Sequence, residues 1–587
     1  MNSVFKVPAL NIPVESVLTL PGSKSQANRA IICAALADGI TTITNATPCD
    51  DVAVMVENLQ KMGFDLEWED RSAGVLRISG KMPTRNTQPV TRNELFCGNA
   101  GTTLRFLTSL ACIVPGVWTI TGDEHMCRRP VADLTNALRS LGAEIEDTNG
   151  CPPVRINGGP LRGGYVKLKA TVSSQYLTSL LLVAPKLKEG LRIELDGSLA
   201  SAGYVSLTGE VMNDFGVPVS GGGDSFRVEP ANYRARPKGY EIEGDWSAAG
   251  AWLVLNSLTG SSIDFTNLNL SSGQSDRQVR AAIDRLKTKG DVSLDATLIP
   301  DQVMNLAVMA ALRNGRTTIT GAGNLRYKET NRLKVLVSEL KKAGVEIEER
   351  ADGVVISGQR SAISGQQKPV TLDPSDDHRM AMCFAIIGLI RGGILVRGPE
   401  CVAKSYPRFF RDLEQVISSP KPISIVGMRG AGKSHFGRRL AARLKLEHAD
   451  ADHVFEKKFG PIRPFVEAKG WTAFRKNEEE IVSSLLRPGI VLSCGGGAIE
   501  SSKTRSALAS RSIGIWIEAS ETELVKRLNN GKRPPLTGLA LKEEVQMFLK
   551  KRSPYYQEVS KIRIPANLPF SRQIPYAIKK LESLCRI

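Results

Sequence analysis

Residues suited to holding a polyphosphate stand together in the last third of the chain, where Gly427–Ser434 reads Gly-Met-Arg-Gly-Ala-Gly-Lys-Ser. The apolar run Ile423–Val426 precedes this loop, and Phe436, Leu440 and Leu444 follow it at helical spacing. In a strand–loop–helix context the glycines let backbone N–H groups close around phosphate oxygens, while the lysine adds a point charge. The serine hydroxyl can hold Mg²⁺. The segment therefore predicts a nucleotide-binding domain.

The residues before this loop follow a different, repeated pattern: a helix end, a glycine, a strand, a turn and a second strand. Four segments show it, 62–80, 141–158, 215–228 and 343–358. A glycine followed by an alternating strand begins at Gly39, Gly116, Gly190, Gly260, Gly315 and Gly393. Alternation favours strands with one buried face, and a unit of this length is one small α/β module. The pattern predicts six modules, three in each of two facing lobes.

The repeat stops after Val416, and Ser418–Pro422 is a short polar stretch with two prolines directly before the strand of the phosphate loop. Such composition is typical of a linker. Helices are expected between the strands; one is 332–342, where Leu333, Leu336 and Leu340 share a face.

Composition limits the class of protein. The 587 residues suffice for three to four structural domains. No apolar run is long enough to span a bilayer, and the first residues lack the order of a signal peptide. The ten cysteines are scattered without a CxxC pair, which favours reduced residues over disulfides or zinc ligands. We expect a cytoplasmic protein.

The formal net charge of +17 is compatible with three kinds of partner. Nucleic acid is disfavoured because the basic residues are spread out and are not interleaved with aromatic residues. Small polyanionic substrates require several converging arginines and lysines. A solvated basic surface is the third alternative, and the motifs below favour anionic substrates.

Several polar motifs occur in a fixed order before residue 416. They are Pro21-Gly-Ser-Lys-Ser25, Gly98-Asn-Ala-Gly-Thr-Thr-Leu-Arg105, Arg128-Arg-Pro130, Ser173-Ser-Gln175, Ile299-Pro-Asp301, Arg326-Tyr-Lys-Glu-Thr-Asn-Arg332, Asp377-His-Arg379 and Ala403-Lys-Ser405. This set resembles the family of 5-enolpyruvylshikimate-3-phosphate (EPSP) synthases. The resemblance implies two lobes of three modules each, as the repeat predicts.

The resemblance also implies a reaction between two anions, in which phosphoenolpyruvate is joined to the 5-hydroxyl of shikimate 3-phosphate and phosphate is expelled. The residues implied to hold phosphoenolpyruvate are Lys24, Asn99, Gly101, Arg129, Gln175, Arg332, Arg379 and Lys404. Those implied to hold shikimate 3-phosphate are Lys24, Ser25, Arg29, Ser173, Ser174, Gln175, Ser201, Tyr204, Asp301, Asn324 and Lys328. No cofactor is implied for this reaction.

Four of these residues are implied to be catalytic: Lys24, Asp301, Glu329 and Lys404. Asp301 would accept the 5-hydroxyl proton, and Glu329 would protonate the methylene carbon. Because one carboxylate must begin ionised and the other protonated, their environments are expected to differ. The structural alternatives are that Lys24 lies along a helix start and that Asp301 caps a helix. We expect His378 to be structural.

One departure concerns the segment Ser201-Ala-Gly-Tyr204, because members of the family often carry proline where this chain has Gly203. The assignment of Tyr204 to shikimate 3-phosphate is weakened by this difference.

The phosphate loop is followed by a second ordered set of motifs. They are His448-Ala-Asp-Ala-Asp452, Ala473-Phe-Arg-Lys-Asn-Glu478, Cys494-Gly-Gly-Gly497, Arg533-Pro-Pro-Leu536 and Arg552-Ser-Pro-Tyr-Tyr556. This set resembles shikimate kinase, which implies a parallel sheet flanked by helices and phosphorylation of the shikimate 3-hydroxyl by ATP.

The resemblance to shikimate kinase assigns three groups of residues. ATP would be held by Gly427, Arg429, Gly430, Ala431, Gly432, Lys433, Ser434, Arg527 and Arg533; shikimate by Asp452, Arg475, Gly496, Gly497 and Arg552; and Mg²⁺ by Ser434 and Asp450. Lys433, Asp452 and Arg533 would be catalytic, with Asp452 drawing the proton from the 3-hydroxyl and Glu478 orienting Arg475. The structural alternative is that the two aspartates are only a capping pair.

The expected fold is α/β: a two-lobed synthase of six repeated modules, of the inside-out α/β barrel type, followed by a P-loop kinase. The synthase is expected over 1–416, with lobe one at 1–20 and 244–416 and lobe two at 21–243. A linker at 417–421 and the kinase at 422–587 would complete the chain.

The sequence thus predicts a bifunctional enzyme of the shikimate pathway, similar to the central part of the pentafunctional arom polypeptides. The expected partners are small-molecule substrates, with neither nucleic acid nor membrane. The alternative is an active synthase joined to a catalytically silent, kinase-like scaffold. The sequence carries no signal for an oligomeric state.

Overall fold

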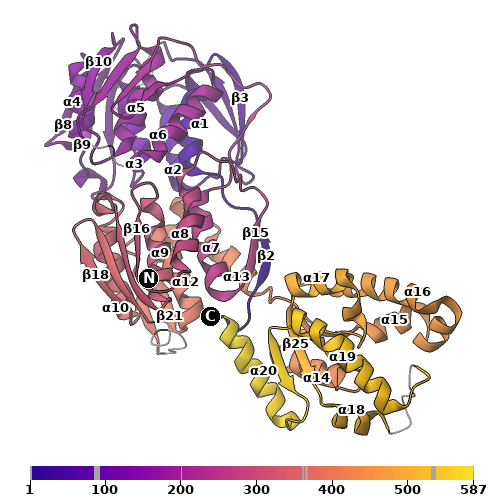
Figure 1. The fold of residues 1–587 in the computed structure, drawn as a ribbon. Helices are drawn as coiled ribbons and strands as arrows, with labels where there is room; N and C mark the ends of the chain where they lie inside the picture. The colour runs from indigo at the N-terminus through magenta and orange to yellow at the C-terminus, as the bar shows by residue number, and fades with distance from the viewer. Residues whose placement is uncertain are drawn as a thin grey trace. The chain divides into compact units, whose positions relative to one another are not determined.

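The computed structural model describes residues 3–84, 93–197, 199, 201–359, 363, 368–529 and 537–585. The chain divides into two compact units, which are drawn in Figure 1. The first unit comprises Met1–Ala9, Leu18–Val254 and Phe265–Phe410, and the second comprises Leu10–Val17, Leu255–Asp264 and Arg411–Ile587. Each unit is described by itself.

Three four-stranded sheets of one design form lobe two, within the first unit. Their strand orders are β14-β3-β5-β4, β6-β7-β9-β8 and β10-β11-β13-β12. The strands are β3 (Gly39–Thr44), β4 (Asp65–Asp70), β5 (Val75–Gly80), β6 (Glu94–Phe96), β7 (Gly116–Thr121), β8 (Glu144–Thr148), β9 (Cys151–Gly158), β10 (Gly164–Leu168), β11 (Leu191–Leu195), β12 (Ser220–Gly222), β13 (Ser225–Val228) and β14 (Tyr240–Glu241). In each sheet the first pair is parallel and the other two are antiparallel, so the three modules repeat one topology.

Lobe one contains two sheets, ordered β16-β17-β19-β18 and β1-β21-β20. A two-stranded sheet, β15-β2, is formed by segments that belong mostly to the second unit. The strands of these three sheets are β1 (Val4–Lys6), β2 (Glu15–Leu18), β15 (Ser262–Phe265), β16 (Val292–Asp295), β17 (Gly315–Thr320), β18 (Glu346–Arg350), β19 (Gly353–Gly358), β20 (Val370–Leu372) and β21 (Ile394–Arg397). The four hairpins predicted from sequence are β4–β5, β8–β9, β12–β13 and β18–β19. The predicted six-module architecture is therefore confirmed.

Helices that are apolar around most of their circumference lie inside the modules (Figure 1). They are α1 (Lys24–Leu36), α3 (Gly101–Ala111), α5 (Ser174–Val183), α9 (Val303–Ala311) and α12 (His378–Arg391). All residues of α9 and α12 are buried. A helix without a polar face must be enclosed, so only the ends of these helices remain available to bind polar molecules.

The second unit contains a five-stranded parallel sheet with helices on its faces (Figure 1). Its strand order is β23-β24-β22-β25-β26, from β22 (Ile423–Val426), β23 (Glu447–Asp450), β24 (Ile490–Ser493), β25 (Ile513–Glu518) and β26 (Ile562–Pro565). The phosphate loop joins β22 to α14 (Lys433–Leu444), on which Phe436 and Leu440 are buried. The predicted strand–loop–helix unit is confirmed.

The segment expected to be a linker is hydrogen-bonded within the second unit. It follows α13 (Phe409–Ile417). The N–H of Lys421 donates to the carbonyl of Pro13 at 2.8 Å, and the N–H of Glu15 donates to the carbonyl of Ser419 at 2.9 Å. Ile12 packs against the apolar core of the same unit. Residues 419–421 are thus held by backbone bonds and do not form a free spacer.

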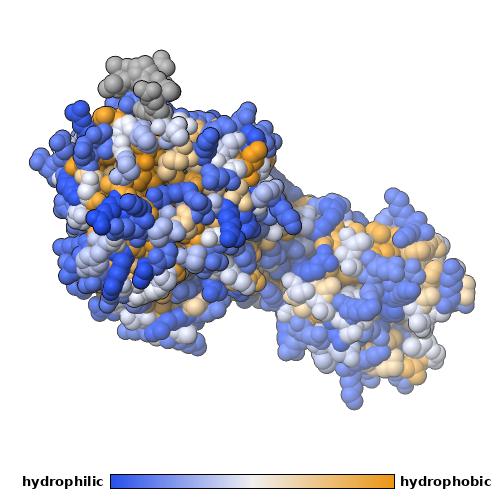
Figure 2. Space-filling model, turned by 90° about the horizontal axis from the view of Figure 1, so that it is seen from above, coloured by the Kyte–Doolittle hydropathy of each residue, from blue (hydrophilic) through white to orange (hydrophobic). Residues whose placement is uncertain are grey.

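Hydrophilic residues cover most of the face shown in Figure 2. Within the part of the chain that the structure describes, no helix is long and apolar enough to cross a membrane. None of the ten cysteines, all of which are among the described residues, forms a disulfide, and seven of them are buried.

Candidate active sites

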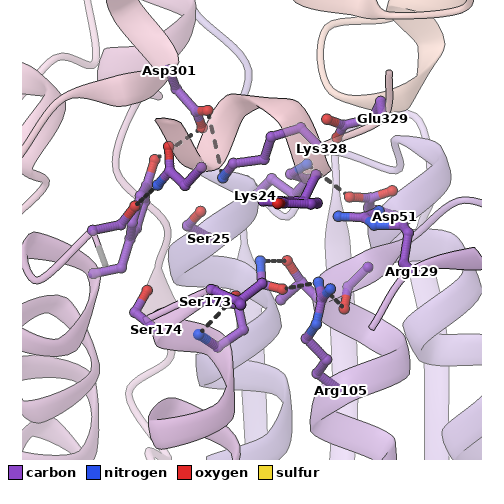
Figure 3. Close-up of a pocket in the computed structure, with 18 of the residues that line it drawn as sticks. Lys24, Ser25, Asp51, Arg105, Arg129, Ser173, Ser174, Asp301, Lys328 and Glu329 are labelled. Carbon is purple, nitrogen blue, oxygen red and sulfur yellow. Dashed lines mark hydrogen bonds and ion pairs between the residues drawn. The ribbon is translucent and has the colours of Figure 1, made fainter. Parts of the chain in front are cut away.

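Most of the residues predicted for the synthase reaction line one cleft of the first unit (Figure 3). The predicted residues in it are Lys24, Ser25, Arg29, Gly101, Arg129, Ser173, Ser174, Gln175, Ser201, Tyr204, Asp301, Asn324, Lys328, Glu329, Arg332 and Arg379. Asn99 and Lys404 line an adjoining cavity that also contains Asp51 and Glu329. The folded chain therefore brings together residues that are up to 380 positions apart (404 − 24).

Helix starts supply many of these side chains. Lys24, Gly101 and Ser174 each begin a helix, α1, α3 and α5 respectively. Arg332 begins α10 (Arg332–Lys342), and Arg379 is the second residue of α12. Because a helix N-terminus carries unpaired N–H groups and partial positive charge, this arrangement favours anionic ligands.

Arg332 is the most heavily paired cation of the cleft. Its Nε donates to Oδ2 of Asp377 at 2.6 Å, Nη1 to Oδ1 of Asp301 at 2.8 Å and Nη2 to Oε2 of Glu329 at 2.6 Å. The side chain is 1% exposed. A buried guanidinium requires such partners, and its fixed fork sets the relative positions of the three carboxylates.

The two carboxylates with predicted acid–base roles are both held ionised. Burial raises the pKa of Asp301, but Arg379, Lys328 and Arg332 outweigh it and hold that pKa well below its usual range. Burial also raises the pKa of Glu329, but Arg332 and Lys404 outweigh burial and hold that pKa well below its usual range. The expected contrast between an ionised and a protonated carboxylate is not produced by the protein's own groups, because each carboxylate faces several cations and both face Arg332.

Asp51 is a site residue that sequence reasoning missed. Its Oδ2 lies 2.7 Å from Nζ of Lys24, and its Oδ1 lies 3.5 Å from Nζ of Lys404. Burial lowers the pKa of Lys24, but Asp51 and Glu329 more than compensate, so the pKa is raised and the ammonium persists. The only signal was an acidic pair, Asp50 and Asp51, at the start of α2 (Asp50–Lys61), where acidic residues are common.

Arg29 lines the cleft, yet its donors are used by the protein. Nε donates to Oγ1 of Thr208 at 2.8 Å, Nη1 to the carbonyl of Ser25 at 2.6 Å and Nη2 to the carbonyl of Tyr204 at 3.1 Å. The residue is 2% exposed. This geometry places Arg29 behind the surface of the cleft, where it supports Ser25 and Tyr204.

Other predicted contacts are also preorganised. Oγ of Ser173 accepts from the N–H of Gln175 at 3.3 Å and caps α5. Oε1 of Gln175 accepts from Nη1 of Arg105 at 2.6 Å, a second pairing that the sequence did not predict. His378 is buried and its pKa is lowered by burial and by Arg379, so it is neutral.

The phosphate loop of the second unit has the predicted backbone form. Gly430 and Gly432 adopt φ of 83° and 99°, which residues with a Cβ rarely adopt. Nζ of Lys433 donates to the carbonyl of Met428 at 3.2 Å. Arg527 lies against the loop, because its Nη1 donates to the carbonyl of Ala431 at 2.9 Å. Arg533 lies outside the described residues.

Asp452 and Arg475, two of the residues predicted to bind shikimate, lie beside the consecutive glycines Gly495, Gly496 and Gly497. A Cβ on Gly495 would lie 2.7 Å from Oδ1 of Asp452, and one on Gly497 would lie 2.0 Å from Nη2 of Arg475. A Cβ on Gly496 would lie 3.0 Å from the backbone N of Arg429 in the phosphate loop. These close approaches favour glycine and connect the predicted shikimate residues to the predicted ATP residues.

Each predicted arginine of this site is paired with a carboxylate. Glu478 accepts a hydrogen bond from Arg475, as expected. Arg552 donates through Nε to Oε1 of Glu500 at 2.7 Å, a partner that the sequence did not reveal. Burial raises the pKa of Asp452, while Lys433 and Arg475 oppose that rise. A carboxylate with a raised pKa is better suited to accept a proton.

Asp450 caps a helix, as the structural alternative anticipated. Its Oδ1 accepts from the N–H groups of Asp452 at 3.1 Å and of His453 at 3.4 Å at the start of α15 (Ala451–Phe459). Among the described residues no group of three or more His, Cys, Asp or Glu could hold a metal ion. The hydroxyl of Ser434 and the carboxylate of Asp450 nevertheless fit Mg²⁺, which takes few protein ligands and otherwise water and phosphate oxygens.

Comparison with known proteins assigns both parts of the chain. Residues 10–413 match the family model described as EPSP synthase (3-phosphoshikimate 1-carboxyvinyltransferase), and residues 429–581 match the model for shikimate kinase. A 3-phosphoshikimate 1-carboxyvinyltransferase of Psychromonas ingrahamii is 34% identical over 69% of this chain and 97% of its own length. A second, from Methanoculleus marisnigri, is 36% identical over 68% of this chain and 96% of its own.

A pentafunctional AROM polypeptide of Lodderomyces elongisporus is similar across both parts. It is 32% identical over 95% of this chain, which spans 39% of that polypeptide. Among solved structures, EPSP synthase from Acinetobacter baumannii aligns with a TM-score of 0.58 at 24% identity, covering 71% of this chain and 98% of its own. That likeness supports the two-lobed fold.

Proposed function

The chain belongs to the EPSP synthase family over residues 10–413 and carries a shikimate kinase domain over residues 429–581. We propose that its two sites catalyse two consecutive reactions. The protein is a bifunctional transferase of the shikimate pathway, and its kinase domain performs an ATP-dependent phosphoryl transfer. The kinase forms shikimate 3-phosphate, which the synthase then joins to the enolpyruvyl group of phosphoenolpyruvate. We place the synthase at 1–416 and the kinase at 422–587, joined by residues 417–421, of which 419–421 are held by backbone hydrogen bonds.

In the kinase, the phosphate loop and Lys433 hold the β- and γ-phosphates of ATP, and Arg527 braces the loop at Ala431. Ser434 and Asp450 hold Mg²⁺, which supplies charge neutralisation on the transferring phosphoryl group when bound. Arg475 and Arg552 clamp the carboxylate of shikimate, a task for which the planar guanidinium is suited. Asp452 accepts the proton of the 3-hydroxyl, in keeping with its raised pKa.

In the synthase, Arg129, Arg332, Arg379 and Lys404 hold the carboxylate and phosphate of phosphoenolpyruvate. Asp301 accepts the 5-hydroxyl proton and Glu329 delivers a proton to the methylene carbon. Phosphoenolpyruvate would take part of the positive charge that these side chains now share with Asp301 and Glu329. Its binding would thus raise the proton affinity of both carboxylates at the moment when proton transfer is required.

The observation that carries the proposal for the synthase is the direct pairing of Arg332 with both Asp301 and Glu329, which joins the proposed binding and proton-transfer groups. For the kinase, it is the close approach of Gly497 to Arg475 and of Gly496 to the phosphate loop.

Separate assays of the two half-reactions test the proposal. Lys433→Ala should lower kinase kcat by about 10²-fold or more and leave the synthase unchanged, since the lysine acts on transition-state charge. Asp301→Asn should lower synthase kcat by about 10²- to 10⁴-fold and leave the kinase unchanged. A wild-type chain that makes EPSP only from added shikimate 3-phosphate would support the alternative, a silent kinase-like scaffold.

A further inference from the structure

A second carboxylate, Asp276, stands beside Asp301 and shares a hydroxyl group with it. Oη of Tyr204 lies 3.0 Å from Oδ2 of Asp276 and 3.2 Å from Oδ2 of Asp301. A phenol has one proton, so it can donate fully to only one of these carboxylates at a time. Neither the repeat nor the motifs singled out Asp276, which lies in the short helix Ser275–Gln278.

The position of Asp276 is fixed by a further set of hydrogen bonds. Its Oδ2 also accepts from Oγ of Ser247 at 2.7 Å, and its Oδ1 accepts from Nε2 of Gln302 at 3.2 Å. Asp276 is 3% exposed, and Gln302, which directly follows Asp301 in the chain, is fully buried. The two aspartates are therefore connected both through Tyr204 and through Gln302.

Gly203 explains how Asp276 reaches Tyr204. A Cβ on Gly203 would lie 2.3 Å from Cβ of Ser275, so only glycine permits this approach of α6 (Gly203–Asp214) to the helix that carries Asp276. The close contact at Gly203 therefore accompanies the approach of Asp276 to within hydrogen-bond distance of Tyr204.

The charges around the pair act in opposite directions. Arg379 lies 3.0 Å from Oδ2 of Asp301, while Arg332 and Lys328 lie 2.8 and 3.8 Å from its Oδ1, and all three weaken it as a base. Asp276 faces Asp301, Arg379 and Asp245; burial and Asp301 raise its pKa, and Arg379 opposes that rise. Glu329 also acts on Asp301. Asp276 is thus the negative group that shares a hydrogen-bond donor with Asp301.

We propose that Asp276 is a positioning residue for the synthase reaction, which draws the Tyr204 proton away from Asp301 and by its charge sustains Asp301 as a proton acceptor. Both effects have the same sign, because each makes protonation of Asp301 more favourable. The inference rests on the proposed function, in which Asp301 accepts the 5-hydroxyl proton.

The pH dependence of Asp276→Asn in the full chain tests this role. Asparagine keeps the size and an acceptor oxygen but removes the charge, so Asp301 becomes a weaker base. Synthase kcat at neutral pH should fall about tenfold, and the acid limb of the kcat profile should move to lower pH by about half to one unit. The KM values for shikimate 3-phosphate and phosphoenolpyruvate should change less than about threefold.

Control variants separate this role from loss of structure. Asp284→Asn, on an exposed side chain of α8 (Val279–Leu286), should leave the profile unchanged. Combined with Tyr204→Phe, Asp276→Asn should cost less than it does alone, because the shared hydroxyl has been removed and only the effect of the charge remains. A KM increase for shikimate 3-phosphate with an unmoved acid limb would overturn the proposal and leave Asp276 a structural support.

Asp301→Asn, measured in parallel, distinguishes a failure of the role proposed for Asp301 from a failure of the role proposed for Asp276. If Asp301→Asn remains active, the proposed role of Asp301 fails, and the inference fails with it. If Asp301→Asn is inactive while Asp276→Asn has the wild-type profile, only the role of Asp276 is overturned.

Discussion

Nη1 of Arg332 lies 2.8 Å from Oδ1 of Asp301, so a cation proposed to bind phosphoenolpyruvate is paired directly with the carboxylate proposed to accept the proton. The same guanidinium contacts Glu329 through Nη2. Binding and proton transfer in the synthase therefore share one group, and a change to that group should affect both.

Arg332→Lys should show this coupling. Lysine keeps the charge but cannot donate to Asp301, Glu329 and Asp377 in three fixed directions. We expect synthase kcat/KM for phosphoenolpyruvate to fall about 10²-fold from misplacement of the proton-transfer groups. Phosphate release from shikimate 3-phosphate and phosphoenolpyruvate measures it, with kinase activity unchanged. Arg326→Lys, at a cation paired with Glu349 away from the cleft, is the matched control and should retain activity; equal losses would refute the account.

Glu329 should contribute acid-sensitive stability. Its pKa in the folded protein is well below the ordinary value of 4.5, because the cations Arg332 and Lys404 outweigh burial. Stability from this group is complete above pH 4.5 and is lost as the pH falls through that value toward the folded pKa. The thermal midpoint of the wild type should therefore drop more between pH 7 and pH 4 than that of Glu329→Gln.

The matched control for this comparison is Glu348→Gln, at an exposed side chain paired with Arg350. Its midpoint should fall with pH as the wild type does. Parallel curves for the wild type and Glu329→Gln would show that Glu329 is not held ionised.

In the kinase, Glu500 should orient Arg552 for binding shikimate. Glu500→Gln retains one acceptor but removes the charge that fixes the guanidinium, which is 4% exposed. We expect KM for shikimate to rise about tenfold, equivalent to about 1.4 kcal/mol, with little change in KM for ATP. Lys551→Gln alters the half-exposed second partner of Glu500 and should change KM less than about twofold. An unchanged KM in Glu500→Gln would remove Glu500 from the site.

The fold was largely predictable because the modules repeat. Glycines at helix ends and alternating strands are local features, and they located all four hairpins and the phosphate loop. The contribution of residues 10–17 to the second unit was not predictable, because it depends on backbone pairing between Pro13 and Lys421, which leaves no pattern in the side chains.

The sequence predicted the site residues that lie in a recognisable motif, but it did not predict the site residues outside those motifs. Asp51, Arg105, Asp276 and Glu500 contact predicted residues only after folding, and each resembles an ordinary helix or loop residue in the sequence. The ionised state of Glu329 could not be predicted from the sequence either, because it depends on contacts with Arg332 and Lys404, which lie on separate helices.

The pairing of residues 13–15 with 419–421 leads to a prediction about the kinase boundary. A fragment of residues 411–587 lacks two backbone hydrogen bonds and the packing of Ile12. The bonds alone are worth about 2 kcal/mol, which corresponds to a midpoint roughly 5 °C below that of the kinase transition in the full chain. Calorimetry with and without ATP identifies that transition. Equal midpoints would show that residues 10–17 add no stability to the second unit.

Phosphorus NMR of the purified chain with shikimate, Mg²⁺-ATP and phosphoenolpyruvate tests the central claim most directly. The two-site account predicts ADP, inorganic phosphate and EPSP together, accumulation of shikimate 3-phosphate in Asp301→Asn, and no ADP in Lys433→Ala. Absence of ADP from the wild type, with EPSP formed only from added shikimate 3-phosphate, would contradict it.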